Sequence, residues 1–439
     1  MLIQFSVENF RSIKGEQTLS IVKDSSNEMS ENYFETEAPL VPMLLRSSVI
    51  YGANASGKSN VLKALKCMAS IVENSAHKKI NKNLPVEPFL LDSVFSEQPT
   101  TFSVSFVVNL PDEETGELRP VRADYGFSAN KKQIIEEWLS IYPKKREQAW
   151  FHRVFDEDTE EYVWLKESNF LKGEKNTWKK STRIDQLFLS IAVQLNSEQL
   201  KPIYEWFSES LKVITSDRLN NQPAISFCKE NEILKNLVID FLKHADIDVD
   251  DIVIKKHNIS FENFPDEFPD ELKEKIKEDF EDHLMAYFIH TDENGKSIRI
   301  ELDDESDGTQ KLFEFSVLIF IALLKGYILV IDELNKSLHP DLVRYLISIF
   351  NSSENKKNAQ LIITTHETSA LRKDLLRRDQ IWFCEKNKDK STTLYPLTDF
   401  SPHKNREDIE ESYLSGRYGG KPIINKFKFP EDLVIEFEE

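Results

Sequence analysis

The chain has 439 residues, a formal net charge of −19 and 40% hydrophobic residues. That content supports a large core, and the length predicts roughly three domains or fewer. The acidic balance argues against nucleic acid as the main partner, because nucleic-acid-binding domains are usually basic. Three widely separated cysteines, Cys67, Cys228 and Cys384, favour reduced thiols over a disulfide framework or a zinc site.

The first residues read as strands rather than as a targeting signal. Residues 2–10 alternate apolar and polar side chains, and Gln17–Val22 offers a second strand that could pair with them as a hairpin. The start is too polar for a signal peptide, and no run of about 18 apolar residues exists to span a membrane. The sequence therefore predicts a cytoplasmic protein with no membrane contact.

The strongest pattern lies at 52–59, which fits G-x-x-x-x-G-K-[ST], the P-loop pattern. An apolar run at 49–51 predicts a buried strand before it, and a helix-forming run begins at Asn60. The loop then lies at a helix N-terminus, where backbone N–H groups and the helix dipole attract phosphate. We expect a nucleotide to be bound by Gly52, Ala53, Asn54, Ala55, Ser56, Gly57, Lys58, Ser59 and Asn60.

Two residues of this loop have individual predicted roles. Lys58 would reach the β- and γ-phosphates of ATP, and the Ser59 hydroxyl would hold Mg²⁺. ATP and Mg²⁺ are therefore the predicted cofactors.

The next stretch is predicted to be β-rich and the one after it helical. Alternating runs at 101–110, 121–127, 134–142, 150–154 and 162–165 predict a β-rich region with turns between the strands. From about residue 180 the period becomes helical, with helices expected over 187–195, 200–207 and 230–244 and an acidic stretch at 266–282. The predicted domains are 1–180, 181–285 (a mainly helical insertion), 286–400 and a tail, 401–439.

Two apolar runs in the third of these segments end in polar side chains. Residues 327–331 are followed by Asp332 and Glu333, as expected of a buried strand that ends at a Mg²⁺ site (Walker B). Asp332 would bind the metal, and Glu333 would orient and deprotonate the attacking water. A second run, 361–365, ends at His366, which could contact the γ-phosphate and report its loss.

The block Glu305–Lys311 opens an apolar helix shortly before the acidic strand. Ser306 can cap that helix, and Gly308 lets backbone approach a phosphate.

In this order, the four motifs resemble those of the ABC-type ATPase superfamily, in particular its RecF/OLD/SMC-like branch. IQFSVENFRSIKG, YGANASGKSN, ESDGTQKLF, IDELNKSLHP and ITTHE are similar to one bacterial group of AAA-type ATPases from anti-phage and abortive-infection loci, which includes the AriA subunit of the PARIS system. The resemblance implies an α/β fold: an ABC-ATPase-like P-loop fold with a mixed β-sheet, an antiparallel β subdomain and a helical insertion.

The resemblance also implies roles for residues and partners. Ser306 and Gly308 would bind the γ-phosphate of a nucleotide held by the opposite subunit, and Asn335–Pro340 would run between subunits. Lys58, Glu333 and His366 would be catalytic. ATP would then join two subunits, as a dimer or an oligomer of dimers, and hydrolysis would release a separate, nuclease-like effector protein.

Two alternatives remain beside this regulator. A DNA-repair ATPase of the RecF or SMC type would use the basic stretches Lys144–Arg146, next to Trp150, Phe151 and Arg153, and Lys172–Arg183, around Trp178. A self-contained OLD-type nuclease is less favoured, because the stretch after His366 is too short for a Toprim domain.

Overall fold

The computed structural model describes residues 1–41, 43–80, 82–112, 114–167, 169–215, 221–256, 284–400 and 408–422. Its centre is a six-stranded sheet with strand order β11-β15-β16-β5-β17-β18. The first five strands are parallel, and β18 pairs antiparallel at the edge. These strands are β11 (Leu211–Ile214), β15 (Ile328–Ile331), β16 (Gln360–Thr364), β5 (Ser47–Gly52), β17 (Ile381–Lys386) and β18 (Thr392–Pro396).

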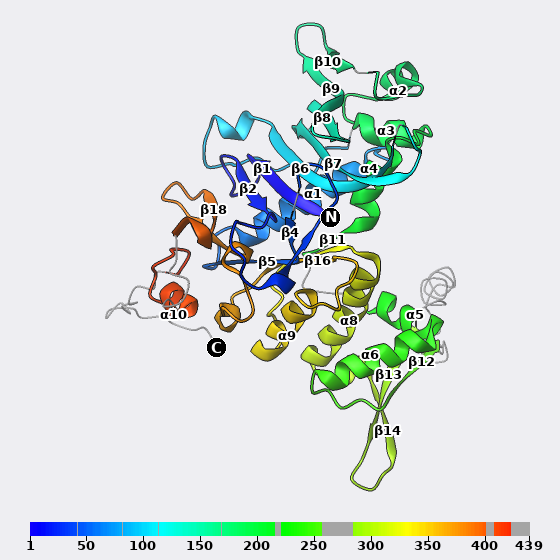
Figure 1. The fold of residues 1–439 in the computed structure, drawn as a ribbon, viewed down its shortest axis with the longest axis vertical. Coiled ribbons are helices and arrows are strands. Elements are labelled where there is room, and N and C mark those ends of the chain that lie inside the picture. Colours follow the sequence, from blue (N-terminus) through cyan, green and yellow to red (C-terminus); the bar gives the residue numbers. More distant parts are fainter. Residues whose placement is uncertain are drawn as a thin grey trace, which may run out of the picture.

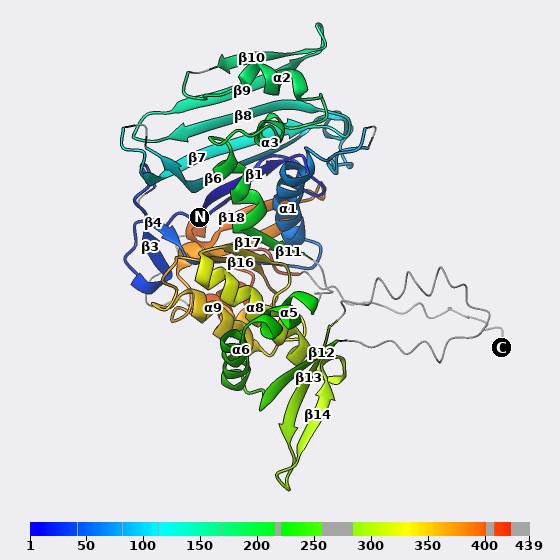
Figure 2. The same ribbon diagram turned by 90° about the vertical axis from the view of Figure 1, so that its right-hand side faces the viewer.

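Alternate side chains of the central strands enter two different cores, and for this reason the strands read as unbroken apolar runs. In β5, Ile50 joins one core, whereas Val49 and Tyr51 join the other. The first core contains α1 (Lys58–Asn74), and the second contains α8 (Asp307–Lys325) and α9 (Pro340–Phe350). Figure 2 shows these layers above and below the central sheet.

A seven-stranded antiparallel sheet, order β10-β9-β8-β7-β6-β1-β2, covers the α1 side (Figure 1). Its strands confirm the predicted β-rich region and the predicted N-terminal hairpin. They are β1 (Leu2–Glu8), β2 (Gln17–Ser20), β6 (Thr100–Pro111), β7 (Leu118–Ala129), β8 (Ile134–Tyr142), β9 (Gln148–Asp156) and β10 (Glu161–Glu167). A separate two-stranded pair is formed by β3 (Tyr33–Glu35) and β4 (Met43–Leu45).

Residues 181–285 do not form one helical body among the described residues. The short helices α2 (Lys175–Ser181), α3 (Phe188–Gln194) and α4 (Lys201–Glu205) contribute to the core under the antiparallel sheet. The buried Glu137 of β8 fixes α3 by accepting hydrogen bonds from the backbone N–H groups of Phe188 and Leu189 at 2.7 and 3.0 Å. The same segment then supplies β11 to the central sheet, because its apolar run continues past the helices.

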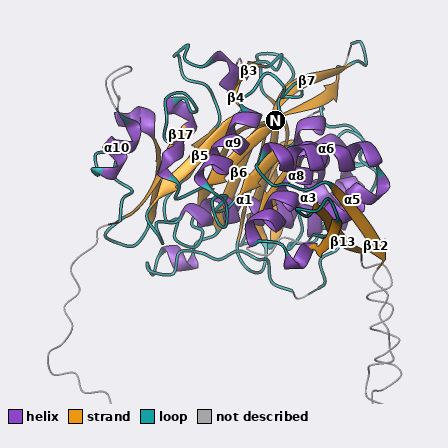
Figure 3. Ribbon diagram, turned by 90° about the horizontal axis from the view of Figure 1, so that it is seen from below, coloured by secondary structure: helices purple, strands orange, loops and turns teal. Residues whose placement is uncertain are grey.

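The remaining part of this segment packs on the opposite side. Helices α5 (Gln222–Glu230) and α6 (Glu232–His244) lie against α8, beside a three-stranded sheet of β12 (Asp251–Lys256), β13 (Leu284–Thr291) and β14 (Ser297–Glu301). Figure 3 shows α8 and α9 lying across the central strands, with β12 and β13 to one side. The acidic stretch at 266–282 lies outside the described residues.

The last described element is α10 (Ile409–Leu414), which lies beside β18 in Figure 1. Tyr413 and Tyr418 stack on Phe383 of β17, with ring centroids 5.3 and 5.7 Å apart. This segment is therefore packed against the end of the central sheet. No helix among the described residues is both long and apolar enough to cross a membrane.

The aromatic residues of the two basic stretches are buried. Trp150, Phe151 and Trp178 are core residues, and Arg153 forms a buried ion pair with Glu137 at 2.7 Å. These aromatic side chains therefore offer no stacking faces for the DNA-binding alternative, and the exposed lysines and arginines of the two stretches are read as solvated faces.

Candidate active site

The P-loop joins β5 to α1 at the carboxyl edge of the central sheet, as the sequence predicts. No side chain caps the N-terminus of α1. The N–H groups of Asn60 and Val61 donate to the Gly57 carbonyl, which leaves those of Lys58 and Ser59 for an anion. Gly57 has φ +106°, and a Cβ atom there would collide with Thr392. Only glycine fits this position, because a side chain would be both strained and obstructed.

A cavity of about 240 Å³ lies over this loop. It is lined by Asn54, Ala55, Ser56, Gly57, Lys58, Ser59, Asn60, Glu333 and His366. Residues from three distant parts of the sequence therefore meet at one cavity, because β5, β15 and β16 are neighbours in the sheet and all end at the same edge.

Lys58 is 5% exposed, and its ammonium donates hydrogen bonds to the backbone oxygens of Gly52 and Ala53 at 2.8 and 3.1 Å. Burial lowers the pKa of Lys58, although Cys384, Glu333 and Asp332 act in the opposite direction. The two remaining predicted loop residues, Gly52 and Ala53, thus hold the lysine rather than line the cavity.

Ser59 and Asp332 lie close together, as expected of residues that share a metal. The Ser59 hydroxyl donates to Oδ1 of Asp332 at 3.1 Å. Hydroxyl and carboxylate oxygens are ligands that Mg²⁺ prefers, and Mg²⁺ usually needs only one or two protein ligands beside phosphate and water. No group of three or more His, Cys, Asp or Glu side chains that could hold a metal occurs in the described part of the chain. The donor set fits Mg²⁺ held jointly with a nucleotide.

Glu333 has an unusual backbone conformation, with φ +52°. A non-glycine residue in this region is uncommon and is held only where its surroundings fix it. Here the Glu333 N–H donates to Oγ1 of Thr364 at 2.8 Å, and the Thr364 hydroxyl donates to Oδ1 of Asp332 at 2.5 Å. Thr364 thereby positions both acidic residues at once.

His366 is held by the loop that follows the acidic strand. Its backbone N–H and the Thr365 hydroxyl both donate to Oδ1 of Asn335, at 3.2 and 3.0 Å. Burial and the nearby Lys58 ammonium lower the pKa of His366, and Glu333 and Asp332 act in the opposite direction. Thr364 and Asn335 are positioning residues to which the sequence analysis assigned no such roles. The one available signal was a pair of threonines at the end of a buried strand.

Ser306 and Gly308 do not line this cavity. The Ser306 hydroxyl caps α8 by accepting from the Thr309 N–H at 3.1 Å, as predicted. Gly308 packs closely against the Ser337 carbonyl, which a Cβ atom would approach to 2.9 Å. The N-terminus of α8 therefore packs against the loop 335–340.

A phosphate-binding loop on a parallel sheet, with a hydroxyl–carboxylate pair and a second acid beside it, defines a P-loop nucleotide-binding protein. Residues 47–372 match the family described as "AAA domain, putative AbiEii toxin, Type IV TA system". This match covers well over half of the chain, which therefore belongs to this family. No curated protein matches the sequence.

Solved structures similar to this chain include heads of SMC proteins and a recombination mediator. The head domain of SMC from Thermotoga maritima is 10% identical with a TM-score of 0.38, covering 90% of this chain and 98% of that one. The SMC head bound to the C-winged helix domain of ScpA is 11% identical with a TM-score of 0.37, and the match covers 90% of this chain and 97% of that one. The recombination mediator RecF with ATP is 13% identical with a TM-score of 0.33, and the match covers 90% of this chain and 97% of that one. At such scores, the P-loop assignment depends on the family and on the site geometry.

Proposed function

We propose that this protein is a Mg²⁺-dependent ATPase of the ABC type that acts as a nucleotide-gated regulator. The observation that carries the proposal is the single cavity over the P-loop, where Glu333 and His366 face the phosphate-binding residues and Ser59 lies within hydrogen-bond distance of Asp332. A nucleoside triphosphate and a water molecule placed there would contact the phosphate-binding loop, Glu333 and His366 of this chain.

Five side chains in and beside the cavity, those of Lys58, Ser59, Asp332, Glu333 and His366, have distinct roles in this proposal. Lys58 and the first turn of α1 bind the β- and γ-phosphates, and Ser59 and Asp332 hold Mg²⁺, which neutralises phosphate charge. Glu333 accepts the proton of the attacking water, because it faces the cavity from the end of β15, which β16 separates from the P-loop strand β5. His366 contacts the γ-phosphate and thereby links hydrolysis to the loop that Asn335 fixes.

The proposed active site needs a second copy of the chain. Ser306 and Gly308 lie outside the cavity of their own chain, at the capped start of α8. A second subunit could apply this helix N-terminus to the γ-phosphate. ATP would then hold a homodimer together and hydrolysis would release it.

The partner that such a switch controls is proposed to be a separate effector protein in a bacterial anti-phage defence system. The acidic net charge and the family description, which names a toxin and a TA system, support a protein partner. A RecF- or SMC-like role in DNA repair is the second candidate. It has less support, because the aromatic residues of the two basic stretches are buried.

The test compares Glu333→Gln, which should bind ATP without hydrolysing it, with Lys58→Ala, which should bind ATP poorly. We expect ATP to convert Glu333→Gln into a dimer in light scattering after size exclusion, and Lys58→Ala to stay monomeric. Glu354→Gln, an exposed acid-to-amide change, is the matched control and should behave as wild type. A Glu333→Gln protein that binds ATP yet remains monomeric would contradict the dimer, and one that hydrolyses ATP normally would contradict the site.

A further inference from the structure

A second cavity, of about 590 Å³, lies beside the P-loop and shares Ala55 with the nucleotide cavity. Its apolar part is the segment Pro88–Leu91. Leu90 and Leu91 are 73% and 69% exposed, which is unusual for two consecutive leucines. Such a patch indicates a binding surface rather than a part of the core.

The other part of this cavity is strongly cationic. Arg11, Lys131, Lys386 and Lys390 line it, and the only acid among its lining residues, Glu87, pairs with Arg11 at 2.8 Å. No ion pair joins Lys131, Lys386 or Lys390 to another described residue. In a chain of net charge −19, three lysines gathered without counter-charges favour an anionic occupant.

Nearby carboxylates do not neutralise these lysines, because they are engaged elsewhere. Asp92 and Asp389 both pair with Lys14, at 2.9 and 3.5 Å. Asp389 also accepts hydrogen bonds from the Ser391 backbone and hydroxyl. The excess positive charge is therefore a property of the cavity as the described residues form it.

The combination of exposed leucines and lysines suits an acidic, apolar peptide better than it suits nucleic acid. Single-stranded nucleic acid stacks its bases on exposed aromatic faces. The aromatic residue of the segment, Phe89, is only 1% exposed, so it offers no stacking face. Aliphatic side chains would instead pack on Leu90 and Leu91 while carboxylates meet the lysines.

The chain itself contains a segment of this chemistry. Residues 431–439, EDLVIEFEE, carry five carboxylates, no lysine or arginine, and the four apolar side chains of Leu433, Val434, Ile435 and Phe437. The segment lies outside the described residues, and its composition complements both parts of the cavity.

The end of the described chain lies within reach of this cavity. Gly420 packs against Gly52 and the Cys384 carbonyl, at the end of β17. Lys386, two residues further along β17, already lines the cavity. The eight residues 423–430 can span up to about 26 Å, so the segment 431–439 is tethered by a linker of this reach to a point next to β17.

We propose that residues 431–439 dock in cis into the cavity formed by Pro88–Leu91, Lys131, Lys386 and Lys390. The apolar side chains of the segment cover Leu90 and Leu91, and its carboxylates pair with the three lysines. This docking places an acidic segment next to Ala55 of the P-loop. It does not depend on ATP hydrolysis and can be tested apart from the proposed function.

The test is carbodiimide crosslinking of the full-length protein, which joins a lysine to a carboxylate only where the two touch. We expect crosslinks from Lys131, Lys386 or Lys390 to residues 431–439, within one chain when isotopically light and heavy proteins are mixed. The Lys14–Asp92 pair serves as the internal positive control. The double variant Lys386→Glu/Lys390→Glu should lose these crosslinks, whereas Lys144→Glu, an exposed charge reversal elsewhere, should keep them.

Two results would overturn the proposal. One is that residues 431–439 form no crosslink with the three lysines while Lys14–Asp92 does. The other is that the crosslinks join light to heavy chains, which would place the segment in a neighbouring copy. If crosslinks are absent and Lys386→Glu/Lys390→Glu loses binding to a labelled single-stranded oligonucleotide, the cavity is a nucleic-acid site instead.

Discussion

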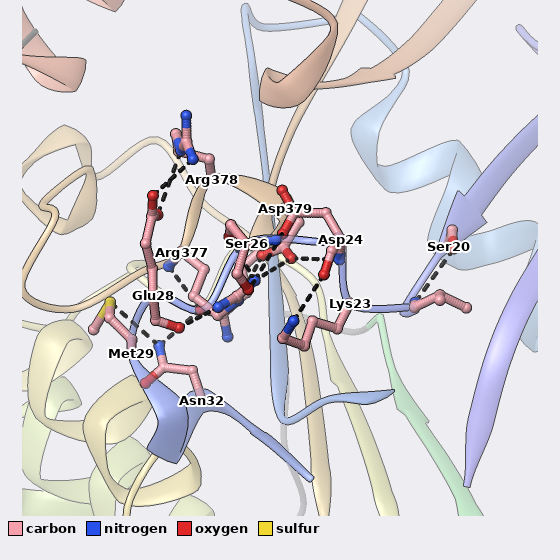
Figure 4. A network of polar contacts seen from close by, with 12 residues as sticks. Ser20, Lys23, Asp24, Ser26, Glu28, Met29, Asn32, Arg377, Arg378 and Asp379 are labelled. Carbon is pink, nitrogen blue, oxygen red and sulfur yellow. Dashed lines mark hydrogen bonds and ion pairs between the residues drawn. The ribbon is translucent and has the colours of Figure 1, made fainter. Parts of the chain in front are cut away.

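Lys58 and Arg377 are both cations with almost no solvent exposure, at 5% and 1%, yet their surroundings differ. Arg377 donates to Asp379 at 2.7 and 2.9 Å and to Asp24 at 2.9 Å, and it also bonds the Glu28 carbonyl (Figure 4). Lys58 bonds only two backbone carbonyls, and no ion pair joins it to another described residue.

Arg377 has a charge that is matched inside the fold, whereas the proposed function gives the unmatched charge of Lys58 to a bound phosphate. Arg377 ties the loop around residues 24–28 to the start of β17, and its charge is matched inside the protein. The pKa of Lys58 is lowered by burial, because its charge is not matched until an anion binds. Burial alone therefore does not identify a functional cation; its partners do.

The largest expected effect is the loss of the Arg377 network. Arg377→Met should lower the free energy of unfolding by about 3–5 kcal/mol, because it leaves Asp379 buried without its counter-charge. Urea unfolding followed by tryptophan fluorescence measures this. Arg378→Met is the matched control and should cost about 1 kcal/mol or less, since its ion pair with Glu28 is partly exposed. Equal losses for both variants would contradict a structural role specific to Arg377.

Lys58→Ala should affect ATP binding strongly and the free energy of unfolding only slightly, the reverse of Arg377→Met. ATP affinity should fall by about 10- to 100-fold through loss of charge-assisted hydrogen bonds to phosphate. The unfolding free energy without ATP should change by less than about 1 kcal/mol, because the removed charge is desolvated and unpaired. Calorimetric titration with ATP measures the affinity, and urea unfolding without ATP measures the stability. Lys66→Ala, on an exposed part of the same helix, is the control and should retain wild-type affinity.

A smaller effect is expected at Thr364, which positions the acids without touching the nucleotide itself. Thr364→Val keeps the shape but removes the hydrogen bonds to Asp332 and to the Glu333 N–H. We expect kcat to fall about tenfold with little change in KM. Ser48→Ala in the adjacent strand β5 is the control, because the buried Ser48 hydroxyl has no hydrogen-bond partner among the described residues. A rise in KM at constant kcat would indicate that Thr364 acts in binding instead.

The sequence predicted the P-loop, the acidic strand and the capped α8 because each depends on local order along the chain. Buried parallel strands read as apolar runs, and each ends at a polar residue that marks the edge of the sheet. The positioning roles of Thr364 and Asn335 escaped prediction because they depend on which strands are neighbours. Likewise, β11 was missed inside a segment read as helical, since four residues show too little periodicity to reveal a strand.

The burial of the aromatic residues in the two basic stretches is also not visible in the order of the residues along the chain. Trp150 lies five residues after Lys145, and Trp178 precedes Lys179 and Lys180, but both tryptophans are buried in the core whereas Lys144, Lys145 and Lys180 are exposed. Conversely, the cavity beside the P-loop draws Arg11, Lys131 and Lys386 from three distant segments. No window of the sequence could show that charge cluster.

The smallest expected effect concerns Glu314, a buried carboxyl of α8. Unlike the guanidinium of Arg377, it has no ion pair with another described residue, and unlike Lys58 it lines no proposed ligand site. Burial raises the pKa of Glu314 to about 7, and Lys311 lowers it only in part. The unfolded chain releases this proton near the ordinary value of 4.5, so the folded state holds more protons between those two pH values. Stability should therefore be highest below about pH 4.5 with respect to this group, and should be lost as pH rises to about 7.

Glu314→Gln removes the titration and should stabilise the protein above about pH 7. The gain should be about 1 kcal/mol rather than the full cost of the charge, because the amide is itself a buried polar group. Urea unfolding at pH values on both sides of the transition measures it, with Glu354→Gln as the exposed control. A difference in stability between wild type and Glu314→Gln that does not change between about pH 4.5 and about pH 7 would contradict this prediction. The Glu314 carboxyl would then be stabilised by an ion pair in solution, as Arg377 is.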